Sequence, residues 1–155
     1  METLRPILEQ HPFLKGLAPE YIELLTGCAA NVRFKEGEYL FREGKKADQF
    51  FILRGGRVSL ETYAPGRGTI LIQTVGEDEV LGWSWLIRPY KWSFDGRALE
   101  MTRAISLDAR CLRDKCAEDH NLGYEFMQRF ADVMVQRLRA THLQLIDMYQ
   151  GAPRK

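Results

Sequence analysis

The chain has 155 residues and a formal net charge of +1, from 22 basic and 21 acidic side chains. This balance argues against a broad nucleic-acid-binding surface, whose affinity depends on concentrated positive charge. The hydrophobic fraction of 45% is typical of one folded domain, and no apolar run approaches the ~20 residues that a membrane helix needs. The N-terminus lacks a secretory signal and the three cysteines are widely spaced, so we expect free thiols in a cytoplasmic protein.

The first part of the chain predicts a helical arm over residues 1–30. Pro19 begins an apolar pattern typical of a short helix, because proline is favoured in the first helical turn. From Val32 the apolar period changes to two, and glycine-containing turns recur about every ten residues. This spacing favours an antiparallel barrel or sandwich, which we place at residues 31–108. The predicted strands cover residues 32–34, 39–41, 49–53, 57–63, 69–75, 97–100 and 103–107.

After Asp108 the apolar period becomes helical, and residues 109–150 are predicted to form the C-terminal helices. The longer of these helices runs from His120 to about Tyr149 and would span ~40 Å, more than the size of a small barrel. Its distal part keeps an apolar stripe that one barrel cannot cover, which predicts a homodimer through this helix. The residues expected at the dimer interface are Leu138, Leu145 and Met148.

The most unusual stretch, residues 76–98, lies between the predicted strands and helices. It contains all three tryptophans of the chain, Trp83, Trp85 and Trp92. Glycine and proline within such an aromatic segment are typical of a loop carried by a rigid scaffold, where binding sites are common. The alternative is that the rings fill a core, since aromatic side chains bury large areas. Composition alone leaves both alternatives open.

Residues 34–61, FKEGEYLFREGKKADQFFILRGGRVSLE, resemble the cyclic-nucleotide-binding domain of bacterial catabolite-activator-type regulators, kinase regulatory subunits and gated channels. The resemblance rests on the spacing Phe34-x-x-Gly37-x-x-Leu40, then Glu43-Gly44, then Asp48-x-Phe50-Phe51-Ile52-Leu53-x-Gly55. It implies an α+β fold in a single domain over residues 1–155. This fold comprises an eight-stranded antiparallel β-roll of the jelly-roll type, a short N-terminal helix and a long C-terminal dimerisation helix.

The resemblance also implies that residues 80–98 form the family's phosphate-binding cassette. In the family, a Gly-Glu pair and a short helix precede an arginine that pairs with the cyclic phosphate, and the glutamate holds the ribose 2′-hydroxyl. Gly82 matches the glycine, but Trp83 stands where the glutamate belongs. Counting back from the next strand without a gap puts Trp92 at the arginine position, whereas a longer cassette puts Arg97 there.

Three further residues are candidates by position. Arg88 is a third choice for the phosphate partner, although it precedes a proline and is expected at the rim. Thr141 and His142 match the segment of the long helix that covers the nucleotide base, but the alternative, which the residues favour slightly, is that both lie at the surface or in the dimer seam. The predicted ligand-binding set is Gly82, Trp83, Ser84, Trp85, Trp92, Arg97, Ala98, Thr141 and His142.

Two functions from different classes are expected. One is a non-enzymatic, ligand-sensing regulatory module that binds a small anionic, nucleotide-like effector between the roll and the long helix. Ordinary cAMP or cGMP binding is expected to be weak or absent, because Trp83 replaces the ribose-binding glutamate. The other is a degenerate domain whose tryptophans plug the pocket and which acts as a dimeric scaffold for a protein partner.

Other chemistry is not supported. Cys111, Cys116 and His120 do not have the spacing of zinc ligands, so no metal site and no catalytic residue are predicted. No certain cofactor is implied, and the ligand considered is a cyclic nucleotide or a related anion. The family's helix-turn-helix would follow the long helix and has no counterpart in this sequence, so neither direct DNA binding nor a membrane partner is expected.

Overall fold

The computed structural model describes residues 4–151; residues 1–3 and 152–155, which the predicted domain range includes, lie outside the described residues. The helices are α1 (Leu4–Gln10), α2 (Pro19–Thr26), α3 (Ala109–Glu118) and α4 (His120–Gln150). The strands are β1 (Ala29–Phe34), β2 (Tyr39–Phe41), β3 (Gln49–Gly55), β4 (Val58–Ala64), β5 (Gly68–Val75), β6 (Val80–Leu81), β7 (Asp95–Ala98) and β8 (Thr102–Asp108).

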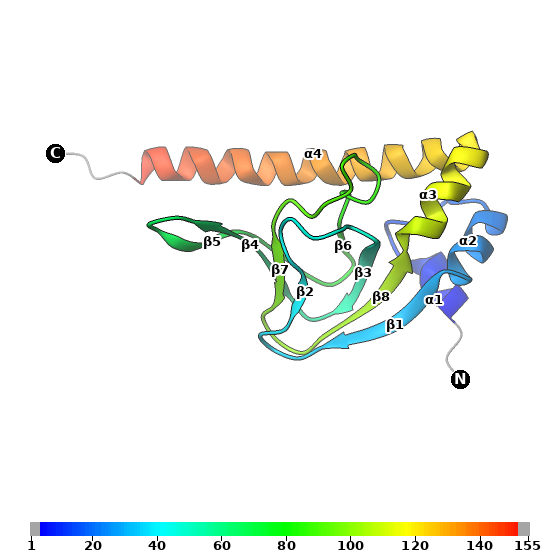
Figure 1. Cartoon of the computed structure of the whole chain (residues 1–155), viewed down its shortest axis with the longest axis horizontal. Helices are drawn as coiled ribbons and strands as arrows, with labels where there is room; N and C mark the ends of the chain where they lie inside the picture. Colours follow the sequence, from blue (N-terminus) through cyan, green and yellow to red (C-terminus); the bar gives the residue numbers. More distant parts are fainter. Residues whose placement is uncertain (1–3, 152–155) are drawn as a thin grey trace.

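The strands form a β-roll of two four-stranded antiparallel sheets, with α4 lying along its length (Figure 1). One sheet has the order β1-β8-β3-β6 and the other β2-β7-β4-β5. Gly37, Gly44 and Gly56 lie in turns between strands at φ near +90°, which glycine adopts without strain. This α+β roll with a long C-terminal helix is the fold that the sequence predicted, and the prediction is confirmed.

An aromatic cluster joins the roll to the first half of α4. The Trp85 ring is fully buried and stacks on Phe50 with the ring centroids 5.0 Å apart. Phe126 and Phe130 of α4 meet Trp85 edge-on at 5.6 Å each. Aromatic pairs at these distances add to the stabilisation from area burial alone. The cluster therefore holds the first half of α4 on the roll.

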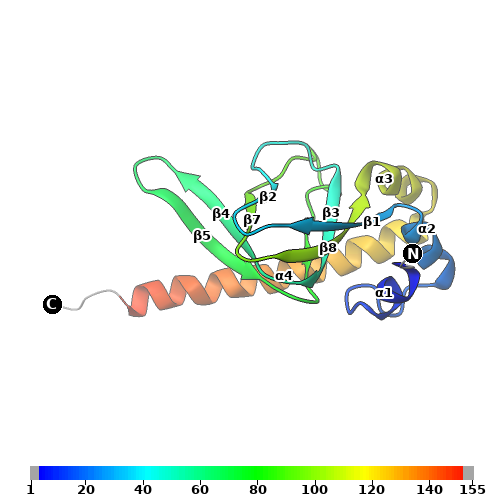
Figure 2. The ribbon, with the colours of Figure 1, turned by 90° about the horizontal axis from the view of Figure 1, so that it is seen from below.

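The distal half of α4 extends in the same direction as the β4–β5 hairpin (Figures 1 and 2), and Gln144 contacts β5 there. The buried side chains of α4 all lie in its first eleven residues, His120–Phe130. Further along, Leu138, Leu145 and Met148 are 69%, 53% and 70% exposed. The described residues contain no helix that combines the length and the apolar character needed to cross a membrane.

Hydrogen bonds from side chains tie the N-terminal arm to α4. Arg129 of α4 donates from Nε to the carbonyl of Phe13 at 3.0 Å and from Nη2 to that of Lys15 at 3.1 Å. At its other end, the Tyr21 hydroxyl donates to Asp119, the N-cap residue of α4, at 3.0 Å. The arm is thus tied to α4 at two places.

His11 makes the stability of this arm depend on pH. The side chain is buried, and its Nδ1 accepts a hydrogen bond from the Phe13 N–H at 3.2 Å. Burial lowers the pKa of His11, and a Leu53 backbone group and the charge of Asp78 oppose that shift only in part. The unfolded chain therefore takes up a proton at a higher pH than the folded chain does. We expect the free energy of unfolding to fall as the pH drops below about 6.5.

Thermal melts between about pH 7.5 and about pH 5 test this expectation. His11→Asn is the matched control, because an amide oxygen can replace Nδ1 as the acceptor and does not titrate. The variant should lose part of the acid-induced drop in melting temperature. An equal drop in the variant and the wild type would show that His11 does not contribute.

Candidate functional site

The segment after β6 begins with a sharp bend at Gly82, which has φ +100°. Residues 83–87 form a turn in which the Leu86 N–H donates to the Trp83 carbonyl at 3.0 Å. This turn occupies the place where the resemblance implied a short helix. Arg88, the third candidate for a phosphate partner, is exposed on the outer side of the segment and precedes Pro89 through a cis peptide bond.

Trp92 lies inside the roll against Gly82. Its ring is 6% exposed and stacks on Phe41, with the centroids 3.8 Å apart and the planes 11° from parallel. It also lies over Phe51 at 6.5 Å. A Cβ atom on Gly82 would come within 2.7 Å of the indole, so only glycine allows this approach. The Trp92 backbone exchanges hydrogen bonds of 2.9 Å with residues 44–45, which hold the ring in place.

The other two tryptophans have different environments. Trp85 belongs to the buried cluster with Phe50 and α4, and this packing accounts for its position. Trp83 is half-buried, and Phe94 meets its ring edge-on at 5.5 Å. Of the three indoles, Trp92 is therefore the one that contacts Gly82 within the roll.

Arg97 lies in β7 with its side chain on the opposite face from the Phe41–Trp92 pair. Successive side chains of a strand alternate between faces, and a Cβ on the preceding residue, Gly96, would touch the Phe41 ring at 2.5 Å. Arg97 instead donates from Nη2 at 2.7 Å and from Nε at 3.2 Å to a carboxylate oxygen of Glu61. The hydrogen bond to Glu61, together with the charge of that carboxylate, raises the pKa of Arg97.

Glu61 was not expected to be part of any site. Its side chain is only 4% exposed and accepts hydrogen bonds from Arg97 and from the Ser59 hydroxyl, the latter at 2.7 Å. Nothing in the local sequence marks it, because its burial depends on the pairing of β4 with β7. Two other predicted site residues, Ser84 and Ala98, are buried with exposures of 6% and 1%.

Thr141 contacts the roll, whereas His142 is exposed. The Thr141 hydroxyl accepts a hydrogen bond at 3.1 Å from Nε2 of Gln73, a residue of β5. Gln73 Nε2 also donates to the main-chain carbonyl of Arg137 at 2.8 Å. A side chain of the roll therefore holds the α4 position that the resemblance aligned with the base-covering segment. Gln73 was not among the predicted residues.

Two further contacts hold α4 on the roll. Gln144 Nε2 donates to the carbonyl of Ile72 at 2.6 Å, and Arg137 Nη2 donates to that of Val80 at 2.6 Å. Arg137 Nη1 also lies 3.7 Å from the Glu79 carboxylate. Burial lowers the pKa of Arg137, and the charge of Glu79 partly offsets that shift. Nothing in the sequence indicated this contact.

Arg113 of α3 connects three segments around the tryptophans. Its guanidinium donates to the carbonyls of Trp85 at 2.9 Å and Ala47 at 3.1 Å, and it pairs with Asp48 at 3.2 Å. It also lies over the Tyr90 ring, 4.4 Å from the centroid. A single side chain thus holds the segment after β6, the turn before β3 and α3 together.

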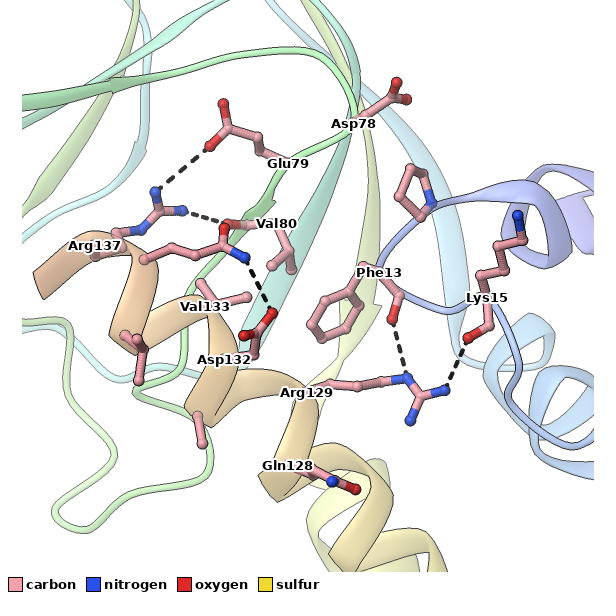
Figure 3. A pocket seen from close by; sticks show the side chains of 14 residues that line it. Phe13, Lys15, Asp78, Glu79, Val80, Gln128, Arg129, Asp132, Val133 and Arg137 are labelled. Carbon is pink, nitrogen blue, oxygen red and sulfur yellow. Dashed lines mark hydrogen bonds and ion pairs between the residues drawn. The ribbon is translucent and has the colours of Figure 1, made fainter. Parts of the chain in front are cut away.

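Two cavities lie near the residues described above. One, about 660 Å³, lies between the N-terminal arm, the turn before β6 and α4 (Figure 3). Its charged lining residues are Lys15, Asp78, Glu79, Arg129, Asp132 and Arg137. Three of these residues are basic and three are acidic, so the lining does not favour an anionic ligand. The other cavity, about 300 Å³, lies at the β2–β3 turn beside Trp92. Neither cavity is lined by Gly82, Arg97 or Thr141.

Comparison with known proteins identifies the family and several similar folds. Residues 31–119, more than half of the chain, match the family model described as the cyclic nucleotide-binding domain. The CRP-like cAMP-activated global transcriptional regulator of Mycobacterium tuberculosis is 26% identical over 142 residues, covering 92% of this chain. The chain spans 62% of that regulator's length. Human cGMP-dependent protein kinase 2 is 28% identical over 140 residues, 88% of this chain and 18% of the kinase.

Solved structures agree with this assignment. A candidate cyclic nucleotide-binding protein of Geobacter metallireducens has a TM-score of 0.80 at 25% identity, covering 89% of this chain and 99% of its own. The Thermus thermophilus catabolite activator protein has a TM-score of 0.67 at 23% identity, covering 89% of this chain and 63% of its own, which supports the fold. The chain is therefore a member of the cyclic nucleotide-binding domain family, whose role is regulatory and generally non-enzymatic.

Proposed function

We propose that this chain is a non-enzymatic regulatory module in which Trp92 fills the nucleotide site and which acts by self-association through α4. The observation that carries the proposal is the Trp92 ring, stacked on Phe41 at 3.8 Å and in contact with Gly82. By ungapped counting, Trp92 stands at the position of the family's phosphate-binding arginine. Trp92 would therefore take the place of this arginine and occupy part of the volume that the nucleotide would fill.

Energetics argue against cAMP or cGMP at this site. A phosphate beside Gly82 would require the Trp92 ring to leave its packed position, and emptying such a site costs about 3–5 kcal/mol, or roughly 10²- to 10³-fold in affinity. With Trp83 at the glutamate position, the ribose hydroxyl also lacks a charge-assisted hydrogen bond worth about 1.5–3 kcal/mol. Arg97 offers no compensation, because Glu61 already neutralises it.

The docking of α4 supports an output that does not depend on a ligand. Gln73 of the roll and Gln144 of α4 donate across the boundary between them, at 2.8 Å to Arg137 and 2.6 Å to Ile72. Both hydrogen bonds form between groups of the protein, so no bound nucleotide base is needed to hold α4 on the roll. A helix held in this way presents the same distal apolar stripe at all times, and we propose that this stripe is the output surface.

The relatives suggest the kind of process that the module serves. The Mycobacterium tuberculosis protein is by name a cAMP-activated transcriptional regulator, and the human relative is a cGMP-dependent kinase. We propose a regulatory role for this chain by analogy, with a protein partner recognising the dimer. The alternative role, sensing of an anionic effector between roll and helix, requires Trp92 to move aside.

Titration of the purified chain with cAMP and with cGMP separates these alternatives. We expect no saturable change in tryptophan fluorescence, and no heat of binding in calorimetry, up to about 1 mM nucleotide. The tryptophans are suitable probes, because Trp92 would have to leave its stack with Phe41 for either nucleotide to bind. Saturable binding at low micromolar concentration would refute the filled-site proposal and favour the effector sensor.

A further inference from the structure

Two cysteines that are distant in sequence lie at the junction of the N-terminal arm and α3. Cys28 is the last residue before β1, and Cys111 is the third residue of α3. The β1–β8 register pairs Ala29 with Leu107. One step further along, the Asp108 N–H donates to the Cys28 carbonyl at 3.0 Å. Cys28 therefore lies opposite the residue that begins α3.

The start of α3 directs Cys111 toward this position. The Asp108 carboxylate caps the helix by accepting hydrogen bonds from the N–H groups of Arg110 and Cys111. Side chains of an α-helix lean toward its N-terminus, so the Cys111 side chain leans back toward Asp108 and its partner Cys28. The Cys111 side chain raises the pKa of Cys28, so the two thiols are close neighbours.

The two thiols differ in access to solvent. Cys111 is exposed, while Cys28 is partly buried. Burial, followed by the hydrogen bond with Cys111, raises the pKa of Cys28 to about 11. Cys111 is thus the thiol that a reagent in solution can reach first, and Cys28 is a protonated thiol close to it.

We propose that Cys28 and Cys111 are a redox modification site, at which a small disulfide such as glutathione disulfide converts the two thiols to an intramolecular disulfide. The Cys111 thiolate attacks one sulfur of the reagent, forming a mixed disulfide and releasing one reagent thiolate. Cys28 then gives up its proton and attacks the Cys111 sulfur, releasing the second reagent thiolate. Two protein thiols are oxidised and one reagent disulfide is reduced to two thiols. The proposal does not depend on the proposed function of the Trp92 site.

The disulfide would restrain α3, the helix that carries Arg113. Arg113 lies two residues after Cys111 and donates to the carbonyls of Trp85 and Ala47. The covalent link would therefore join the arm and β1 to the element that holds the segment after β6. Reduction would return α3 to its non-covalent contacts alone.

The test is to incubate the whole chain with excess glutathione disulfide and to measure its intact mass and melting temperature. We expect the mass to fall by two hydrogens without a glutathione adduct, and peptide mapping to link Cys28 to Cys111. The melting temperature should rise by about 5 °C or more, because the link closes a long loop of the unfolded chain. Added dithiothreitol should reverse both changes.

Single variants separate this pair from the third cysteine. Cys28→Ser and Cys111→Ser should each prevent the loss of two hydrogens, and Cys28→Ser should leave a stable glutathione adduct on Cys111. Cys116→Ser is the matched control and should oxidise as the wild type does. Three results would overturn the proposal: a wild-type chain that stays reduced, one that stops at the adduct, or one that cross-links to a second copy or through Cys116.

Discussion

Trp92→Ala is expected to lower the free energy of unfolding by about 3–5 kcal/mol. The indole is 6% exposed, stacks on Phe41 at 3.8 Å and closes over Gly82, so its removal empties a packed site inside the roll. The roll cannot collapse fully into this space, because β2, which carries Phe41, is fixed by its pairing with β7. Urea denaturation followed by far-ultraviolet circular dichroism measures the loss without relying on tryptophan fluorescence.

Two variants serve as controls for this prediction. Trp92→Phe keeps a ring that can stack on Phe41 and should recover much of the lost stability. Trp83→Ala removes an indole that is half-exposed and makes one edge-on contact with Phe94, so it should lower stability less than Trp92→Ala. If Trp92→Ala unfolds at the wild-type urea concentration, the ring does not fill the site in solution.

Leu138→Glu and Leu145→Glu are each expected to dissociate a homodimer formed through α4. Both leucines are more than half exposed in the single chain, at 69% and 53%. In a two-fold dimer both chains would place the introduced carboxylate in the interface, so two charges would be buried. One unpaired buried charge costs about 3–5 kcal/mol, which raises the dissociation constant by more than about 100-fold. Sedimentation equilibrium at micromolar protein concentration should show a dimeric wild type and monomeric variants.

Leu143 provides the matched control, because it is 65% exposed and allows the same chemical change. It is rotated about 140° around the helix from Leu138, so it does not share the predicted seam. Leu143→Glu should therefore leave the dimer intact. A wild type that sediments as a monomer, or a Leu143→Glu chain that dissociates as readily as Leu138→Glu, would count against this interface. Circular dichroism of all variants checks that the roll is still folded.

The sequence predicted the regular elements well because their boundaries are encoded locally. Glycines with positive φ mark several of the strand turns, and Asp108 and Asp119 cap the two C-terminal helices. Changes of period at Val32 and Asp108 separate the strands from the helices. By contrast, α1 lies within the predicted helical arm but was not predicted as a separate helix, because its segment is short and is stabilised by burying Leu8 against the core.

The candidate site was harder to predict, since its geometry depends on strand register. Sequence alone left Trp92 and Arg97 as alternatives for one position. The pairing of Arg97 with Ser59 puts its guanidinium on the face where Glu61 is buried, whereas Trp92 faces Phe41. Neither fact is visible in a linear pattern. The assignment of ligand-binding residues and the division of residues 1–155 into arm, roll and helices stay predictions.

The hydrogen bonds that dock α4 depend on the identity of the donor residues but not on that of the acceptor residues. Gln73, Arg137 and Gln144 each donate to a main-chain carbonyl, and two of these acceptors belong to Ile72 and Val80. A main-chain acceptor is present whichever side chain its residue carries, so substitutions at Ile72 or Val80 leave it in place. Evolution can therefore change the acceptor residues without any matching change in the donors. Methods that infer contacts from correlated substitutions would find little signal here, although the helix is held at each of these points.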